Sequence, residues 1–159
     1  MILHDLCVAG FTAALLILSL FDLKTGRLPD RIVLPSLWVG LLLNSSSAAF
    51  VSASDAIVGA AAGYCVLRVL AITYQLRRAG PAFGRGDMKL AAMIGAWLGV
   101  GALPSVFFVA FVSGTAAVGV PLMLRKLSLK QKVAFGPALA AGGAITLVSG
   151  PSLFGLLSI

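Results

Sequence analysis

The sequence contains no glutamate, one histidine and two cysteines in 159 residues. A single His, at position 4, cannot supply the His pair of zinc peptidases, and no Ser-His pairing offers an imidazole base for nucleophilic hydrolysis. Cys7 and Cys65 lie apart in apolar segments without CxxC spacing, which argues against a zinc site or a disulfide framework. We therefore expect no metal and no cofactor, and any acid-base chemistry falls to the aspartates.

Charge is also scarce, at 11% of residues against 60% apolar residues. One soluble core of this size cannot hide so much hydrophobic surface, so the bilayer is the expected solvent. The first apolar run follows His4 and Asp5 rather than a basic region, which favours a retained span over a signal peptide. We predict an all-α, polytopic membrane helical bundle that forms a single domain over residues 1–159. The apolar runs predict about six transmembrane helices, at 5–21, 31–44, 55–76, 88–102, 104–124 and 133–157.

The net charge of +7 is distributed in a way that opposes nucleic-acid binding, because the basic residues cluster in alternate connections instead of forming one surface. The connections at 44–54 and 99–104 contain no Lys or Arg. All basic connections can therefore lie on one side, the cytoplasm, with both termini extracytoplasmic. The three basic groups are Lys24, Arg27 and Arg31; Arg77, Arg78, Arg85 and Lys89; and Arg125, Lys126, Lys130 and Lys132.

Two features inside the predicted spans, a stripe of small residues and an arginine, are explained by helix packing and by the membrane environment. Ala91, Gly95 and Gly99 recur every four residues, which predicts a smooth stripe where another helix backbone approaches closely. Arg68 lies inside the third span, where a charge must snorkel to the surface, pair or face a cavity, and we favour snorkelling.

Three of the five aspartates fall on the expected cytoplasmic side. Asp30 precedes an apolar run, where a carboxylate caps free backbone N–H groups, and capping is enough to explain it. Asp22 stands at the C-terminal end of the first span, where the helix dipole disfavours negative charge. It either marks the membrane boundary, paired with Lys24 or Arg27, or serves a function.

Asp87 follows Gly84-Arg85-Gly86, immediately before the fourth apolar run. It could be another helix cap, but the two glycines permit close approach of a substrate strand or a neighbouring helix. Because Asp22 and Asp87 both fall at the cytoplasmic boundary, they can meet across packed helices. Paired carboxylates in a partly desolvated site share a proton, which provides an acid and a base for peptide hydrolysis.

The residues that surround these aspartates resemble the type IV prepilin peptidases, the GxGD-type membrane aspartyl proteases. The resemblance covers roughly residues 20–145 in the family's order. It rests on Asp22 with Leu28-Pro29-Asp30; Leu34-Pro35, Trp38, Gly40-Leu41 and Asn44; Gly63-Tyr64; Gly84 to Leu90; Gly95 to Gly99; Leu103-Pro104; and Phe135 to Ala140.

The resemblance implies that Asp22 and Asp87 are catalytic, with Gly84, Gly86, Lys89 and Asp30 supporting the loop or the substrate. It implies cleavage of a short basic leader from type IV pilus prepilins or type II secretion pseudopilins, after Gly and before a hydrophobic helix. The expected location is the bacterial inner membrane, among membrane lipids, with the active site facing the cytoplasm. Many members carry an N-terminal region with paired CxxC motifs that is associated with methylation; this chain begins at the first span, so we expect peptidase activity without methyltransferase activity.

Two other classes compete with the peptidase. A small ion-coupled transporter or channel would favour ionisable groups near the middle of the membrane, and a non-catalytic scaffold would not need both aspartates. The sequence leaves open which pilin is cut, the oligomeric state, which aspartate is the acid, and whether the two lie close together without substrate.

Overall fold

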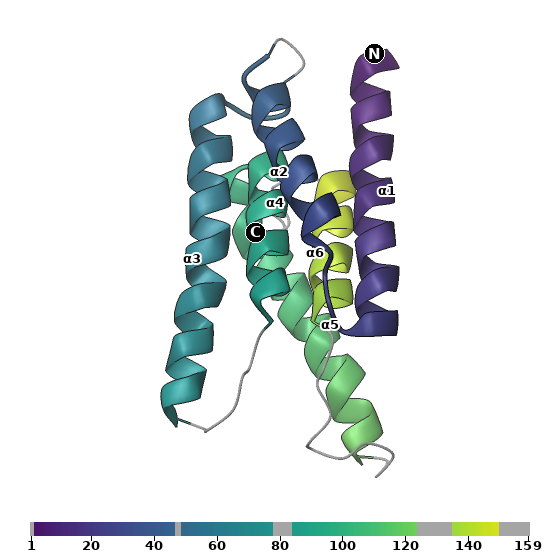
Figure 1. Cartoon of the computed structure of the whole chain (residues 1–159), viewed down its shortest axis with the longest axis vertical. Coiled ribbons are helices and arrows are strands. Elements are labelled where there is room, and N and C mark those ends of the chain that lie inside the picture. The colour runs from purple at the N-terminus through teal and green to yellow at the C-terminus, as the bar shows by residue number, and fades with distance from the viewer. Residues whose placement is uncertain (1, 47–48, 78–83, 124–134, 150–159) are drawn as a thin grey trace, which may run out of the picture.

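The computed structural model describes residues 2–46, 49–77, 84–123 and 135–149. All regular structure in this part of the chain is helical, which confirms the all-α class (Figure 1). The elements are α1 (Ile2–Thr25), α2 (Asp30–Asn44), α3 (Ala53–Arg77), α4 (Arg85–Leu98), the 3₁₀ turn η1 (Val100–Ala102), α5 (Leu103–Met123) and α6 (Gly136–Ser149).

Successive helices run in opposite directions along the bundle (Figure 1). The C-terminal ends of α1 and α3 therefore lie at the same end as the N-terminal ends of α2, α4 and α6. The start of α1 lies at the opposite end. This alternation brings Asp22 and Asp87 to one end of the molecule, as the basic connections predict.

Each of the six predicted segments contains a helix, but fewer helices are long enough to cross a bilayer. Among the described residues, α1 and α3 each have the length and apolar composition of a span. A third candidate combines α4 with the first part of α5, across a 118° bend. Gly99 begins this bend with a φ of +77°, a conformation that favours glycine. The described residues form six α-helices, one in each predicted segment. By length and composition alone, two or three stretches of the described residues qualify as spans. Residues 133, 134 and 150–157 of the last predicted span lie outside the described residues, and the orientation of the termini stays a prediction.

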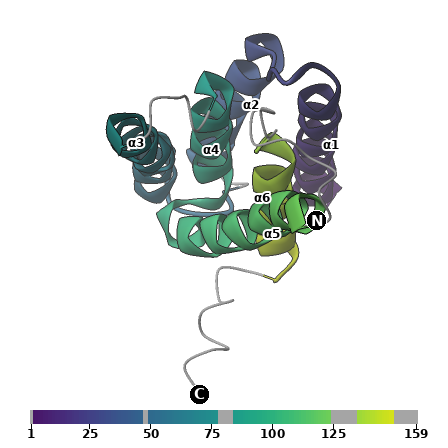
Figure 2. The ribbon, with the colours of Figure 1, turned by 90° about the horizontal axis from the view of Figure 1, so that it is seen from below.

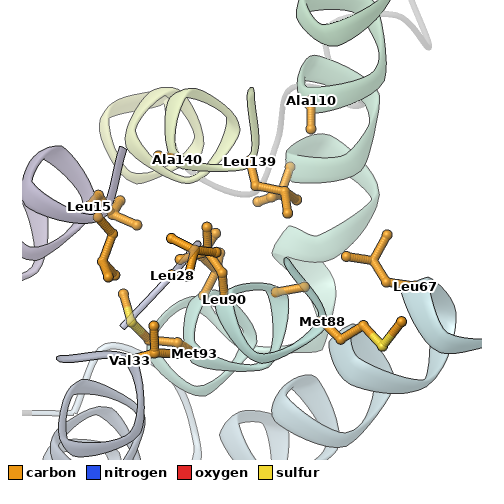
Figure 3. Close-up of a cluster of buried hydrophobic side chains, with 14 of the residues drawn as sticks. Leu15, Leu28, Val33, Leu67, Met88, Leu90, Met93, Ala110, Leu139 and Ala140 are labelled. Carbon is orange, nitrogen blue, oxygen red and sulfur yellow. The ribbon is translucent and has the colours of Figure 1, made fainter. Parts of the chain in front are cut away.

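Helix α4 is the centre of the bundle. Ten of its residues are buried, from Asp87 to Trp97 with Lys89 as the exception. Figure 3 shows the apolar cluster around it, in which Leu90 of α4 lies with Leu28 from the loop after α1 and Leu139 of α6. This burial fixes the position of the first turn of α4, which carries Asp87.

The small-residue stripe of α4 packs against α3, as predicted. A Cβ atom added at Gly63 would lie 2.5 Å from the carbonyl oxygen of Ala91, and one added at Gly59 would lie 2.5 Å from that of Gly95. Backbone-to-backbone contact of this kind requires small residues on both helices. Substitution at either α3 glycine would push α3 away from α4.

The end of α4 far from the aspartates is held by the buried side chain of Asn44, the last residue of α2. Its Nδ2 donates to the carbonyl oxygens of Ala96, at 2.8 Å, and Trp97, at 3.1 Å. Its Oδ1 accepts hydrogen bonds from the backbone N–H groups of Phe50 and Val51. One amide thus binds carbonyl groups at the end of α4 and backbone N–H groups of the connection to α3, and so links α2, α4 and that connection.

The outer surface is apolar. Large hydrophobic side chains such as Leu16, Ile57 and Phe108 are more than half exposed, as expected for helices that face lipid. Arg68 is exposed on α3 and does not line the cavity that holds the aspartates. This position agrees with the expected snorkelling side chain.

Candidate active site

The Asp22 side chain is buried near the end of α1 and is only 5% exposed. Its Oδ2 accepts a hydrogen bond of 3.0 Å from the backbone N–H of Gly136, the first residue of α6. Free N–H groups at a helix start attract a carboxylate, so α6 provides the local positive charge that the end of α1 lacks. The described partner of Asp22 is thus a helix terminus, rather than Lys24 or Arg27 as a simple boundary residue would require.

Asp87 is held by its own helix. Its Oδ2 accepts a 2.9 Å hydrogen bond from the backbone N–H of Gly84, the residue that precedes α4. The backbone N–H of Asp87 donates in return to the carbonyl oxygen of Gly84 at 3.2 Å. Asp87 therefore does cap α4, but it is also 93% buried, which a surface cap does not need.

Both aspartates line one cavity of about 730 Å³ at this end of the bundle. Figure 2, which looks along the bundle from below, shows α6 lying between α1 and α4. Asp22 belongs to α1 and Asp87 to α4, so the two aspartates line the cavity from different helices. The lining residues are Asp22, Gly26, Arg27, Leu28, Pro29, Asp30, Arg31, Gly84, Arg85, Gly86, Asp87 and Lys89.

Glycine is required at position 86 by the close approach of Leu28. A Cβ atom added to Gly86 would lie 2.8 Å from the Leu28 Cβ atom. A side chain at this position would push the first turn of α4 away from the loop that follows Asp22. At Gly84 an added Cβ would meet the Asp87 Oδ2 atom at 3.3 Å. Gly86 thus allows the first turn of α4 to lie against Leu28, and Gly84 leaves room for the Asp87 carboxylate.

Asp30 has a different partner from the one we expected. Helix α2 begins at Asp30 with Pro29 as its N-cap residue, and Asp30 Oδ2 accepts a 2.6 Å hydrogen bond from Lys89 Nζ. The predicted backbone cap is therefore wrong, and an ion pair between α2 and α4 takes its place. The two side chains are 55% and 32% exposed, so the pair lies at the cavity mouth.

Basic residues outnumber acidic ones around the cavity, where Arg27, Arg31, Arg85 and Lys89 face three aspartates. Members of the first two basic groups of the sequence therefore meet at the aspartate cavity, as the charge pattern predicts. The third group, at 125–132, lies outside the described residues. Within the described part of the chain, no group of three or more His, Cys, Asp or Glu side chains is placed to hold a metal ion.

Sequence reasoning singled out Asp22, Asp87, Gly84, Gly86, Asp30 and Lys89, and all six line this cavity. It missed the direct roles of Gly136 and Leu28. Both stand inside the strings that carry the family resemblance, but neither has a functional side chain to mark it. Gly136 contributes a backbone N–H, and Leu28 contributes a packing surface for Gly86.

This arrangement of two buried aspartates in one polar cavity agrees with the comparison to known proteins. The type IV leader peptidase family matches residues 9–119. The chain belongs to this family. Its matched region includes both aspartates and ends within α5.

Individual relatives extend the match over nearly the whole chain. A prepilin leader peptidase/N-methyltransferase of Burkholderia pseudomallei (strain 1026b) is 44% identical over 153 residues, which cover 96% of this chain and 49% of the relative. A protein of the same name from Pectobacterium carotovorum subsp. carotovorum is 45% identical over 134 residues, or 84% of this chain and 48% of the relative. The protein of that name from Neisseria gonorrhoeae is 38% identical over 143 residues, which cover 90% of this chain and 48% of the relative. The chain thus spans about half the length of the curated relatives it matches, and no solved structure matches it.

Proposed function

We propose that this chain is a membrane aspartyl endopeptidase that removes the short basic leader from type IV prepilins or pseudopilins. The observation that carries the proposal is the placement of Asp22 and Asp87, from separate helices, in a single cavity. The names of the relatives, which are prepilin leader peptidases, support the substrate class.

The reaction requires one proton to be shared between the two carboxyl groups. The ionised aspartate takes a proton from water as the water oxygen attacks the scissile carbonyl carbon. The protonated aspartate donates a hydrogen bond to the carbonyl oxygen, on which negative charge develops. When the C–N bond breaks, a proton passes to the leaving amine, and the products are the leader carboxylate and a new N-terminus.

Backbone hydrogen bonds orient the carboxyl groups of the two aspartates. Asp22 accepts its described hydrogen bond through Oδ2 from the backbone N–H of Gly136, and Asp87 through Oδ2 from that of Gly84. Fixed donors keep the carboxyl groups oriented without using a third titratable side chain. We assign the acid and base roles to the pair and not to either aspartate alone.

The site's location favours substrates that lie partly in the membrane. The cavity is at the end of the bundle where basic residues collect, which we propose to be the cytoplasmic face of the bacterial inner membrane. A substrate whose hydrophobic helix is inserted in the bilayer presents its leader at that boundary. Transport is less well supported, because neither aspartate lies midway along its helix.

The test is to incubate the purified chain, in liposomes, with a prepilin that has a basic leader ending in Gly. We expect one cut after that Gly, detected by mass spectrometry of the new N-terminus. Uncut substrate, or cuts scattered along the chain, would contradict the proposal. With S-adenosylmethionine added, the same spectra report whether a methyl group joins the product, which we predict it does not.

A further inference from the structure

A substrate of the proposed kind needs a second binding surface, for the apolar helix that follows the cut. A groove of about 370 Å³ lies between α1 and α2, nearer the far end of the bundle than the aspartate cavity. Its walls include Cys7, Gly10 and Ala14 from α1 and Pro35 and Val39 from α2, together with Trp97 of α4. Its lining is almost entirely apolar.

The α1 wall of this groove differs from the other glycine-containing faces. A Cβ atom added at Gly10 would meet nothing within 4 Å, whereas one added at Gly63 or Gly142 would meet a carbonyl oxygen of a neighbouring helix at 2.5 Å. Positions 7, 10 and 14 share one face of α1. In the described structure, α1 thus presents to the groove a face of small residues that no helix occupies, and such a face allows close helix packing in a membrane.

The groove and the aspartate cavity are bordered by the same two helices. Cys7 precedes Asp22 by 15 residues of continuous helix, a rise of about 22 Å. Gly10 precedes it by 12 residues, or about 18 Å. A helix lying in the groove and running along α1 therefore reaches the level of the aspartates at its cytoplasmic end.

We propose that the groove between α1 and α2 binds the apolar transmembrane helix of the substrate and thereby delivers the leader junction to Asp22 and Asp87. This inference rests on the proposed function. The small residues Gly10 and Ala14 favour a helix as the occupant, because small side chains allow another helix backbone to approach closely. A lipid acyl chain in the groove is the competing occupant, which the experiments below distinguish.

The two native cysteines provide a direct probe. Cys7 is half-buried at the groove, whereas Cys65 is exposed on α3. The probe is a synthetic peptide with a short basic leader ending in Gly, followed by an apolar helix of roughly 20 residues. A single cysteine is moved along that helix, and each peptide is mixed in liposomes with D87N protein that also carries C65A or, as the matched control, C7A.

We expect disulfide cross-linking to Cys7, strongest when the peptide cysteine lies roughly 15 residues beyond the cut, since that spacing matches the rise along α1. Cys65 should give little product at any position. Equal cross-linking to both cysteines, or none to Cys7, would overturn the proposal and leave the groove to lipid. This readout does not depend on cleavage, so it separates failure of the groove from failure of the peptidase function.

Kinetics give an independent readout. Gly10→Leu fills the groove, and Gly101→Leu is its matched control because Gly101 also has open space around it but lies in η1. We compare KM for the full peptide with KM for a short peptide that ends just beyond the cut. The preference for the full peptide should fall about tenfold in Gly10→Leu and persist in Gly101→Leu. An unchanged preference in Gly10→Leu would contradict the assignment, and wild-type protein that cuts neither peptide would instead contradict the proposed function.

Discussion

At the scale of single residues, the site is built from two acidic side chains and two backbone donors. Asp22 is held by the N–H of Gly136 at the start of α6, and Asp87 by that of Gly84 before α4. Each carboxylate therefore sits at the positive end of a helix, which partly offsets the cost of burying its charge. The glycines matter because a side chain at either position would intrude on a carboxylate.

Gly136→Ala should lower kcat for leader cleavage by about 10- to 100-fold, equivalent to about 1.4–2.7 kcal/mol in the barrier. A Cβ atom at position 136 would lie 2.5 Å from Asp22 Oδ2, so the carboxyl group must move from its place in the cavity. Steady-state kinetics on the purified variant, with a prepilin-type substrate, provide the measurement.

Gly142→Ala is the matched control for that variant. It creates a comparable clash, 2.5 Å from the carbonyl oxygen of Val106, but on the part of α6 that is remote from Asp22. Thermal unfolding should show similar destabilisation of both variants, while only Gly136→Ala loses kcat. Equal loss of kcat in the two would mean that Gly136 acts through helix packing alone.

The aspartate pair could be predicted from sequence, whereas its backbone partners could not. Asp22 stood out because it opposes its helix dipole, and Asp87 because two glycines precede it. Gly136 is 114 residues from Asp22 and donates only a main-chain hydrogen, which no residue type reveals. The partner of Asp30 was missed for a related reason: a carboxylate at a helix start suits capping, and only the packing of α2 on α4 brings Lys89 within reach.

At the scale of elements, α2 and α4 are joined along their whole length. Asp30 and Lys89 pair at the cavity end, Trp97 Nε1 donates to the Ser36 carbonyl oxygen at 2.8 Å, and Asn44 binds the last carbonyls of α4. Helix α1 forms the other wall of the groove. Asp87 thus lies on a helix joined to α2 by polar contacts, and the groove that we propose for the substrate helix lies between α1 and α2.

The Asp30–Lys89 ion pair should support the site without taking part in the chemistry. Asp30→Asn and Lys89→Met should each reduce cleavage less than tenfold, because partly exposed pairs contribute only about 0.2–1 kcal/mol. A double-mutant cycle on kcat/KM should give a coupling energy in that range. If Lys89→Met alone abolished cleavage while Asp30→Asn did not, Lys89 would have a catalytic role of its own.

The element boundaries show where hydropathy is informative. The predicted second and fourth segments, 31–44 and 88–102, agree with α2 and α4, which are 15 and 14 residues long. The sequence predicts a connection at 99–104 between the fourth and fifth segments, and the chain bends there by 118°. The angle itself could not be predicted, because it depends on the backbone conformation of Gly99, whose φ is +77°. Hydropathy records burial in lipid and burial in the bundle alike, so it does not reveal that α4 is the buried centre of the bundle.

At the scale of the whole molecule, one end is polar, basic and hollow, and the sides are apolar. The alternating helix directions bring residues from α1, the following loop, α2 and α4 to that end, although they lie far apart in sequence (Figure 1). This separation of surfaces suits a protein that meets water at the cavity and lipid around its sides. The charge pattern of the sequence could therefore predict which charged side chains line the cavity. It could not locate the groove between α1 and α2, because the groove is lined almost entirely by apolar residues.

The central claim is that Asp22 and Asp87 act together as the catalytic pair. The most direct measurement is leader cleavage in membranes by Asp22→Asn and Asp87→Asn, with expression and insertion checked by blotting of the membrane fraction. We predict that each variant inserts normally and that each loses cleavage by roughly a thousandfold or more, because neither carboxamide can share the proton that the reaction requires. Full processing by either variant would contradict the two-carboxylate mechanism.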